Sequence, residues 1–208
     1  MNRQVKTTPR KRPRQDRAKA TVDTILAASA RVLVKRGFDG FTTNEVASAA
    51  GVSIRSLYQY YPNKEALVAA LLEQHVEEMS AMLMGELARV SLLPMAQAVR
   101  VVIEMTIKAH AVEPELHRVL TEQVPRVGRL ARIRELDVLG HRAVTELLKV
   151  RQHELAIRDP ELSAFLLCTS IEAIVHRAVL VAPEWLRDPR LVDEACALVT
   201  RYLGVADG

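Results

Sequence analysis

The sequence is poor in aromatic residues and in glycine, and this shortage limits the folds open to it. Only 4% of the 208 residues are Phe, Trp or Tyr and eight are glycine, although 49% are hydrophobic. Ala, Leu and Val carry most of the apolar content, which favours helices over a sandwich or barrel rich in turns. The hydrophobic fraction is sufficient for a buried core, which excludes disorder for the bulk of the chain. We expect an all-α fold.

Long apolar runs are also absent, and cysteine is scarce. No stretch approaches the roughly 20 consecutive apolar residues that span a bilayer, and no apolar signal-peptide core follows the basic start. These absences predict a cytoplasmic protein with no membrane partner. Cys168 and Cys196 lie in apolar helical patterns, without the spacing of a metal or redox motif, so we interpret both as buried core residues.

Positive charge is concentrated at the N-terminus. Residues 1–20 hold eight Lys and Arg and the single acid Asp16, a net +7; since the whole chain carries +4, the remainder carries −3. Blocks of like charge repel, stay solvated and commonly contact nucleic acid or a membrane. We expect residues 1–16 to form a disordered basic arm, which either touches DNA or only keeps the protein soluble.

The first third of the chain predicts three helices. Apolar residues recur at steps of three and four over 17–36, which indicates an amphipathic helix closed by Gly37. The rhythm then changes to a short helix over 43–50, a turn at Gly51, and a second short helix capped by Ser53 and ending at Tyr60. Two short helices joined by a glycine turn are typical of a helix-turn-helix, whose second helix enters the DNA major groove.

Prolines punctuate the rest of the chain. A longer helix begins at Lys64 and continues toward Leu87, and further helices are expected to start at Pro94, Pro114, Pro125, Pro160 and Pro189. An aspartate precedes each of the last two prolines and can cap the helix that follows. The pattern predicts about nine helices, with no strand and no internal repeat.

Within the expected helix-turn-helix, the side chains divide into an inward and an outward set. Val46, Ala47, Ala50, Val52 and Leu57 fall on the core side, whereas Ile54, Arg55, Ser56, Tyr58 and Gln59 remain for a DNA groove. Arg55 has no acid near it in the sequence, which argues against a structural role. Tyr60 fits either packing or DNA contact, and Tyr61 fits packing better.

The sequence resembles the tetracycline repressor (TetR) family over residues 17–72. The resemblance is carried by the helix that ends in residues 35–38, the turn at 50–53, and the stretch 57–67. It implies a three-helix DNA-binding domain at 17–62 and a larger helical regulatory and dimerisation domain at 63–208. It also implies DNA-binding roles for Thr43, Asn44, Arg55, Ser56, Tyr58, Gln59, Tyr60 and Lys64. With Ser53 and Ile54 at the start of the second short helix, these are the expected DNA-binding residues. The chain departs from the family pattern at Ile54, where a polar residue is common, and at Tyr61, where phenylalanine is usual.

The helix expected over 159–182 is apolar nearly all round, so it needs cover on two sides. A partner subunit provides that cover, and the resemblance implies that the last helix completes a four-helix interface. The expected interface residues are Phe165, Leu166, Thr169, Ala173, His176, Leu198 and Tyr202. The alternative is that both are central helices of a monomer. A two-fold dimer would place its reading helices about 34 Å apart, to match a palindromic operator.

The middle helices, residues 79–155, are where the family usually holds an effector. Met79, Met82 and Met105 offer deformable apolar lining, and His110 and His117 are polar groups that could orient a small molecule. A metal site of His110, Glu113 and His117 is not expected, because Pro114 breaks the helix between them.

These patterns predict a repressor released from double-stranded operator DNA by a small apolar or amphipathic ligand. No nucleophile elbow, phosphate-binding glycine loop or spaced carboxylate pair occurs, so we expect neither an enzyme nor a cofactor. The rival hypothesis is a helical small-molecule-binding or catalytic protein whose helix-turn-helix only packs. A lactose-repressor type of regulator shares the turn sequence, but the leading helix and the lack of strands argue against it.

Overall fold

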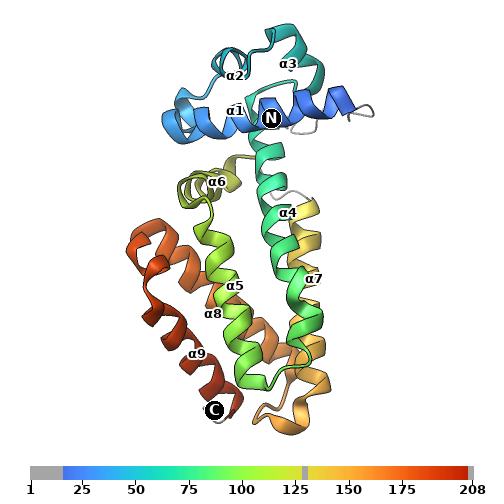
Figure 1. Ribbon diagram of the computed structural model, residues 1–208, viewed down its shortest axis with the longest axis vertical. Helices are drawn as coiled ribbons and strands as arrows, with labels where there is room; N and C mark the ends of the chain where they lie inside the picture. The colour runs from blue at the N-terminus through green and yellow to red at the C-terminus, as the bar shows by residue number, and fades with distance from the viewer. Residues whose placement is uncertain (1–15, 128–130, 206–208) are drawn as a thin grey trace, which may run out of the picture. The chain divides into compact units, whose positions relative to one another are not determined.

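All regular structure is helical in the computed structural model, which describes residues 16–127 and 131–205 (Figure 1). The nine α-helices within these ranges are α1 Asp16–Gly40, α2 Thr43–Ala50, α3 Ile54–Tyr60, α4 Lys64–Val90, α5 Met95–Ala111, α6 Pro114–Val127, α7 Ala131–Val150, α8 Pro160–Val181 and α9 Pro189–Leu203. Two 3-10 helices, η1 Gln152–Glu154 and η2 Pro183–Arg187, flank α8. The all-α expectation is confirmed, while residues 1–15 of the expected basic arm lie outside the described residues.

The chain divides into two compact units. The N-terminal unit comprises residues up to Val76 and Glu115–Ile133, and therefore holds α1 to α3, the first part of α4 and nearly all of α6. The C-terminal unit comprises Glu77–Pro114 and the residues from Arg134 onward, with the rest of α4, α5 and α7 to α9.

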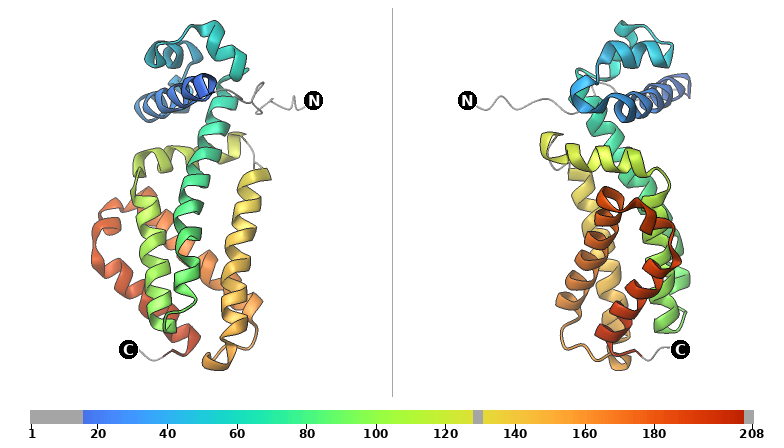
Figure 2. Two further views of the ribbon diagram at one scale, coloured as in Figure 1. Left: turned by 45° about the vertical axis from the view of Figure 1, so that its right-hand side comes forward. Right: turned by 90° about the vertical axis from the view of Figure 1, so that its left-hand side faces the viewer.

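The N-terminal unit is built around one apolar core. Its largest fully buried side chains include Ile25 and Leu33 of α1, Phe41, and Leu57 of α3. Full burial of one such aliphatic side chain stabilises a fold by about 1.5–3 kcal/mol. Figures 1 and 2 show α2 and α3 lying over α1, so the two short helices are held by side chains that point away from solvent.

Local caps set the starts of α2 and α3 and the end of α2 where the sequence predicts them. The hydroxyl of Thr42 accepts the N–H of Glu45 at 3.2 Å, and that of Ser53 accepts the N–H of Ser56 at 3.0 Å. Gly51 ends α2 in the left-handed conformation, with φ 65° and ψ 27°. Gly37 also has a positive φ, 64°, but its ψ is 176°; it breaks α1, and helical turns resume as far as Gly40.

The core of the C-terminal unit lies between α5, α8 and α9. These helices run side by side in Figure 2, and α5 contributes Ile103 and Ile107, α8 Val175, and α9 Val199 to one buried cluster. The expected helix starts at Pro160 and Pro189 are confirmed, and the preceding carboxylates cap both helices.

One expected helix start is wrong. Pro125 lies inside α6, which continues to Val127, and the next helix begins at Ala131. A proline removes one backbone donor and favours a helix start or a kink, but the neighbouring turns decide whether the helix continues past it.

Candidate nucleic-acid interface

The outward face of α3 presents four exposed side chains around a shallow hollow. Ile54, Arg55, Tyr58 and Gln59 line this hollow, which has a volume of about 650 Å³. Leu57 points the opposite way and is fully buried, so it fixes the helix on the core below. Four of the five side chains predicted to point outward on this helix are exposed, and the fifth, Ser56, is half-buried.

Arg55 is an exposed cation on this face. Within the described part of the chain, its guanidinium has neither an ion pair nor a hydrogen bond. A guanidinium can donate two parallel hydrogen bonds to a phosphate or to the O6 and N7 atoms of guanine. Arg55 is therefore available to a ligand of that chemistry.

Tyr58 is connected to the start of α2. Its hydroxyl lies 3.0 Å from Oγ1 of Thr43, so the two side chains share a hydrogen bond. Thr43 is half-buried and its neighbour Asn44 is exposed. The resemblance assigns Thr43 and Tyr58 separately to DNA, and the fold brings them together into one polar edge.

The remaining hydroxyl residues of the segment differ in their surroundings. Ser53 and Ser56 lie with their hydroxyl oxygens 2.8 Å apart at the start of α3. Tyr60 is half-buried against the core, whereas Tyr61 is only 3% exposed. Burial, followed by the nearby Asp23 and Glu73, raises the pKa of Tyr61 to about 12. Tyr61 is a core residue, as the sequence indicates.

Lys64 has a structural contact that the sequence did not reveal. Its Nζ donates to the carbonyl oxygen of Phe38 at 3.1 Å and lies 4.4 Å from the centroid of the Phe38 ring. The side chain therefore ties the start of α4 to the end of α1. An ammonium group has three donors, so this contact leaves donors for a phosphate.

Two arginines of α1 further fix α2 in place. Arg36 pairs with Glu45 at 2.9 Å, and Arg31 donates to the carbonyl oxygen of Ala49 at 3.4 Å. Both contacts are exposed, so each stabilises the fold by about 1 kcal/mol at most. The sequence did not predict either contact, because partners on another helix leave no local pattern.

In the C-terminal unit, α8 and α9 expose much of the apolar surface that the sequence assigns to dimerisation. Exposed members of the expected set are Phe165, Leu166, Thr169, Ala173, Leu198 and Tyr202. His176 differs, because it is half-buried and its ring lies against His110. Among the described residues, α8 alone is long and apolar enough to cross a membrane by length and composition, and only 28% of that apolar stretch is buried.

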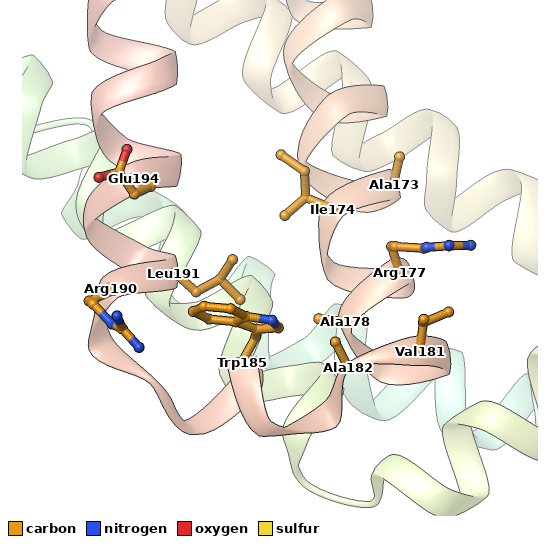
Figure 3. A pocket seen from close by; sticks show the side chains of 10 residues that line it. All are labelled: Ala173, Ile174, Arg177, Ala178, Val181, Ala182, Trp185, Arg190, Leu191 and Glu194. Atoms are coloured by element: carbon orange, nitrogen blue, oxygen red, sulfur yellow. The ribbon is translucent and has the colours of Figure 1, made fainter.

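A groove runs between the end of α8, η2 and the start of α9 (Figure 3). Its volume is about 610 Å³, and Ile174, Trp185 and Leu191 supply much of its apolar lining. Arg177 stands on the α8 side and Glu194 on the α9 side. Within the described residues, neither of these two charges has an ion-pair partner.

The residues expected to bind an effector are divided between the units. In the C-terminal unit, Met79 and Met105 are half-buried, Met82 is 36% exposed and His110 is buried. His117 belongs to the N-terminal unit, where its Nδ1 lies 2.8 Å from Nε2 of His75 in a buried histidine pair between α6 and α4.

Comparison with known families matches both parts of the chain. Residues 25–71 match the family described as bacterial regulatory proteins, tetR family. Residues 94–203 match the family described as the tetracyclin repressor-like, C-terminal domain.

Individual relatives are similar over part of the chain. The uncharacterised HTH-type transcriptional regulator YvaF of Bacillus subtilis (strain 168) is 47% identical over 55 residues, covering 26% of this chain and 28% of that protein. The uncharacterised HTH-type transcriptional regulator MT1294 of Mycobacterium tuberculosis (strain CDC 1551 / Oshkosh) is 30% identical over 112 residues, 54% of each chain. The chain thus spans between about a quarter and about half of the length of these two relatives.

A solved structure extends the similarity of fold over nearly the whole molecule. The crystal structure of a TetR-family transcriptional regulator from Mesorhizobium loti MAFF303099 has a TM-score of 0.75 and 18% sequence identity. It covers 91% of this chain and 98% of its own. At this identity the similarity establishes the fold alone.

Proposed function

Because the chain belongs to the tetR family of bacterial regulatory proteins and is a DNA-binding transcription regulator, we propose that the outward face of α3 reads its operator in the major groove. The observation that carries the proposal is the exposed set of Ile54, Arg55, Tyr58 and Gln59 above a fully buried Leu57. A recognition helix reads base edges through side chains near its N-terminus. Arg55 and Ile54 occupy those positions.

Each residue of this face has its own role in the proposal. Arg55 donates to guanine or to a phosphate, and Ile54 contacts the methyl group of thymine. Tyr58, held by Thr43, donates to the DNA backbone, together with Asn44 at the start of α2 and Lys64 at the start of α4. Ser53, Ser56, Gln59 and Tyr60 complete the surface proposed to contact DNA.

We further propose that two copies associate through α8 and α9. Support comes from the exposed apolar side chains of these helices, including Phe165 and Leu198, which a second copy would remove from water. Arg177 and Glu194 line the same groove and have no ion-pair partner among the described residues, so in the proposed dimer each would be available to pair with its counterpart on the partner subunit. His176 is left out of the proposed interface, because its ring packs inside its own unit.

We also propose that a small molecule regulates DNA binding. In this proposal an effector bound among the middle helices, close to Met79, Met82, Met105 or His110, releases the operator. Such release requires the effector to bind the DNA-free state more tightly than the DNA-bound state. His117 is left out of this proposed site, because it lies in the N-terminal unit, where it pairs with His75.

Selection of DNA by the full-length protein tests the proposal. We expect a library of random duplexes to yield a palindrome whose half-site centres lie about 10 base pairs apart, or a multiple of that spacing. The same motif should occur in DNA upstream of the protein's own gene. A fragment of that DNA should move more slowly in a gel when the protein is added. A helical binding protein whose helix-turn-helix only packs would enrich no motif, and that result would end the proposal.

A further inference from the structure

Two histidines that are far apart in the sequence meet inside the C-terminal unit. His110 lies in the last turn of α5 and His176 in α8, with ring centroids 5.1 Å apart and ring planes at 64°. One ring nitrogen of each lies within 4.8 Å of the other. The expectation of no metal site rested on Pro114, which ends the helix after His110, and it did not consider a ligand from α8.

His110 is buried, and its tautomer is fixed by the backbone. Its Nδ1 lies 2.7 Å from the carbonyl oxygen of Thr106, and a carbonyl oxygen can only accept a hydrogen bond. Nδ1 therefore carries a proton and donates this hydrogen bond. Histidines that bind metals are commonly oriented in this way, by a hydrogen bond from the other ring nitrogen to a carbonyl or carboxylate.

His176 faces His110 from α8. It is half-buried, so its ring is partly sheltered from water. A metal ion binds a neutral imidazole through the lone pair of one ring nitrogen.

We propose that His110 and His176 together bind a divalent transition-metal ion of the Zn²⁺ class, each through one ring nitrogen. Imidazole ligands suit zinc, copper and nickel. On a tetrahedral Zn²⁺ ion with Zn–N bonds of about 2.0–2.1 Å, two ligand nitrogens lie roughly 3.3 Å apart. Because the two ring nitrogens already lie within 4.8 Å of each other, they need to approach by about 1.5 Å at most, and small side-chain rotations are enough for that. Two protein ligands leave coordination positions for water, so the ion binds reversibly and the fold does not require it.

The competing explanation is that the rings only pack. Perpendicular aromatic pairs are themselves stabilising by about 0.5–1.5 kcal/mol, so ring contact without ion binding is chemically reasonable. Ion titration separates the two explanations, because packing alone gives no metal affinity.

The test uses the untagged full-length chain, freed of metal by a chelator and titrated with Zn²⁺ in a calorimeter at pH 7. Co²⁺ serves as a second probe, because its visible absorption reports coordination by nitrogen ligands. The variants are His110→Gln and His176→Gln. The matched control is His153→Gln, which removes an exposed histidine on η1.

We expect one Zn²⁺ per protomer, with affinity reduced roughly tenfold or more in each of the two variants and unchanged in the control. Failure of the native chain to bind Zn²⁺ or Co²⁺ would overturn the proposal, as would binding that both variants retain. If His110→Gln fails to fold, His176→Gln decides alone, since that side chain is only half-buried. The titration contains no DNA, so its outcome is independent of the operator proposal.

Discussion

At the scale of single residues, the proposed DNA surface depends on side chains held in place by a few contacts. Leu57 fixes α3 from below, Thr43 holds the hydroxyl of Tyr58, and Phe38 holds Lys64. Arg55 has no such contact among the described residues, so its guanidinium is available to donate hydrogen bonds to DNA. Substitutions on this face should therefore change operator binding much more than stability.

Tyr58→Phe should weaken operator binding, because it removes a hydroxyl donor to a charged phosphate. The expected loss is about 1.5–3 kcal/mol, or roughly 10- to 150-fold in affinity. Thr43→Val should give a smaller loss in the same direction, since it releases the hydroxyl without removing it. Fluorescence anisotropy with the selected operator measures both. Full affinity in Tyr58→Phe would mean that its hydroxyl serves only the Thr43 contact.

Lys64→Ala should affect both DNA binding and folding. The variant loses a proposed phosphate contact, which should reduce the slope of log affinity against log salt by about 0.9. It also loses the contacts with Phe38, so the melting temperature should fall. Lys64→Arg is the matched control, because it preserves the charge. A lower melting temperature with an unchanged salt slope would assign Lys64 to structure alone.

At the scale of helices and turns, glycine and caps determine where α2 ends and α3 begins. Gly51 adopts a left-handed conformation that side-chain-bearing residues disfavour, and space around it is open. The cost of a side chain there is therefore conformational and not steric.

Gly51→Ala should destabilise the protein by about 1–2 kcal/mol. The matched control is Gly140→Ala in α7, where a Cβ also meets no atom within 4 Å but the backbone is helical. That control should stabilise the protein by about 0.5–1 kcal/mol. Urea unfolding of both variants checks the opposite signs. Equal effects in the two would show that the turn at Gly51 is not required.

The elements also show which features the sequence could predict. The caps at Thr42 and Ser53 and the turn at Gly51 are local, so residue type and spacing were sufficient. The helix start predicted at Pro125 is wrong, because the neighbouring turns of α6 continue the helix past this proline. The pairing of His110 with His176 escaped prediction, since no local pattern indicates which helices will pack together.

At the scale of the whole molecule, the account requires a dimer. A single helix-turn-helix contacts only one half-site, whereas a two-fold pair contacts two at once. The exposed apolar side chains of α8 and α9 are the surface assigned to that association.

Phe165→Glu should disrupt the dimer, because a charge would replace an apolar side chain that the partner covers. Light scattering should show a monomer at concentrations where the native chain is a dimer, and operator affinity should fall at least roughly tenfold, equivalent to about 1.4 kcal/mol. Phe165→Leu is the matched apolar control and should remain dimeric. A dimeric Phe165→Glu would place the interface elsewhere.

Substitution of Arg55 tests the reading face of α3 most directly. We expect Arg55→Ala to weaken binding to the selected operator by about 1–3 kcal/mol and to relax base preference at one position of each half-site. Arg142→Ala, which removes an exposed arginine on α7, should bind as the native chain does. Operator affinity measured by anisotropy at fixed salt decides the matter: a selective loss in Arg55→Ala supports the account, and equal affinity in all three proteins contradicts it.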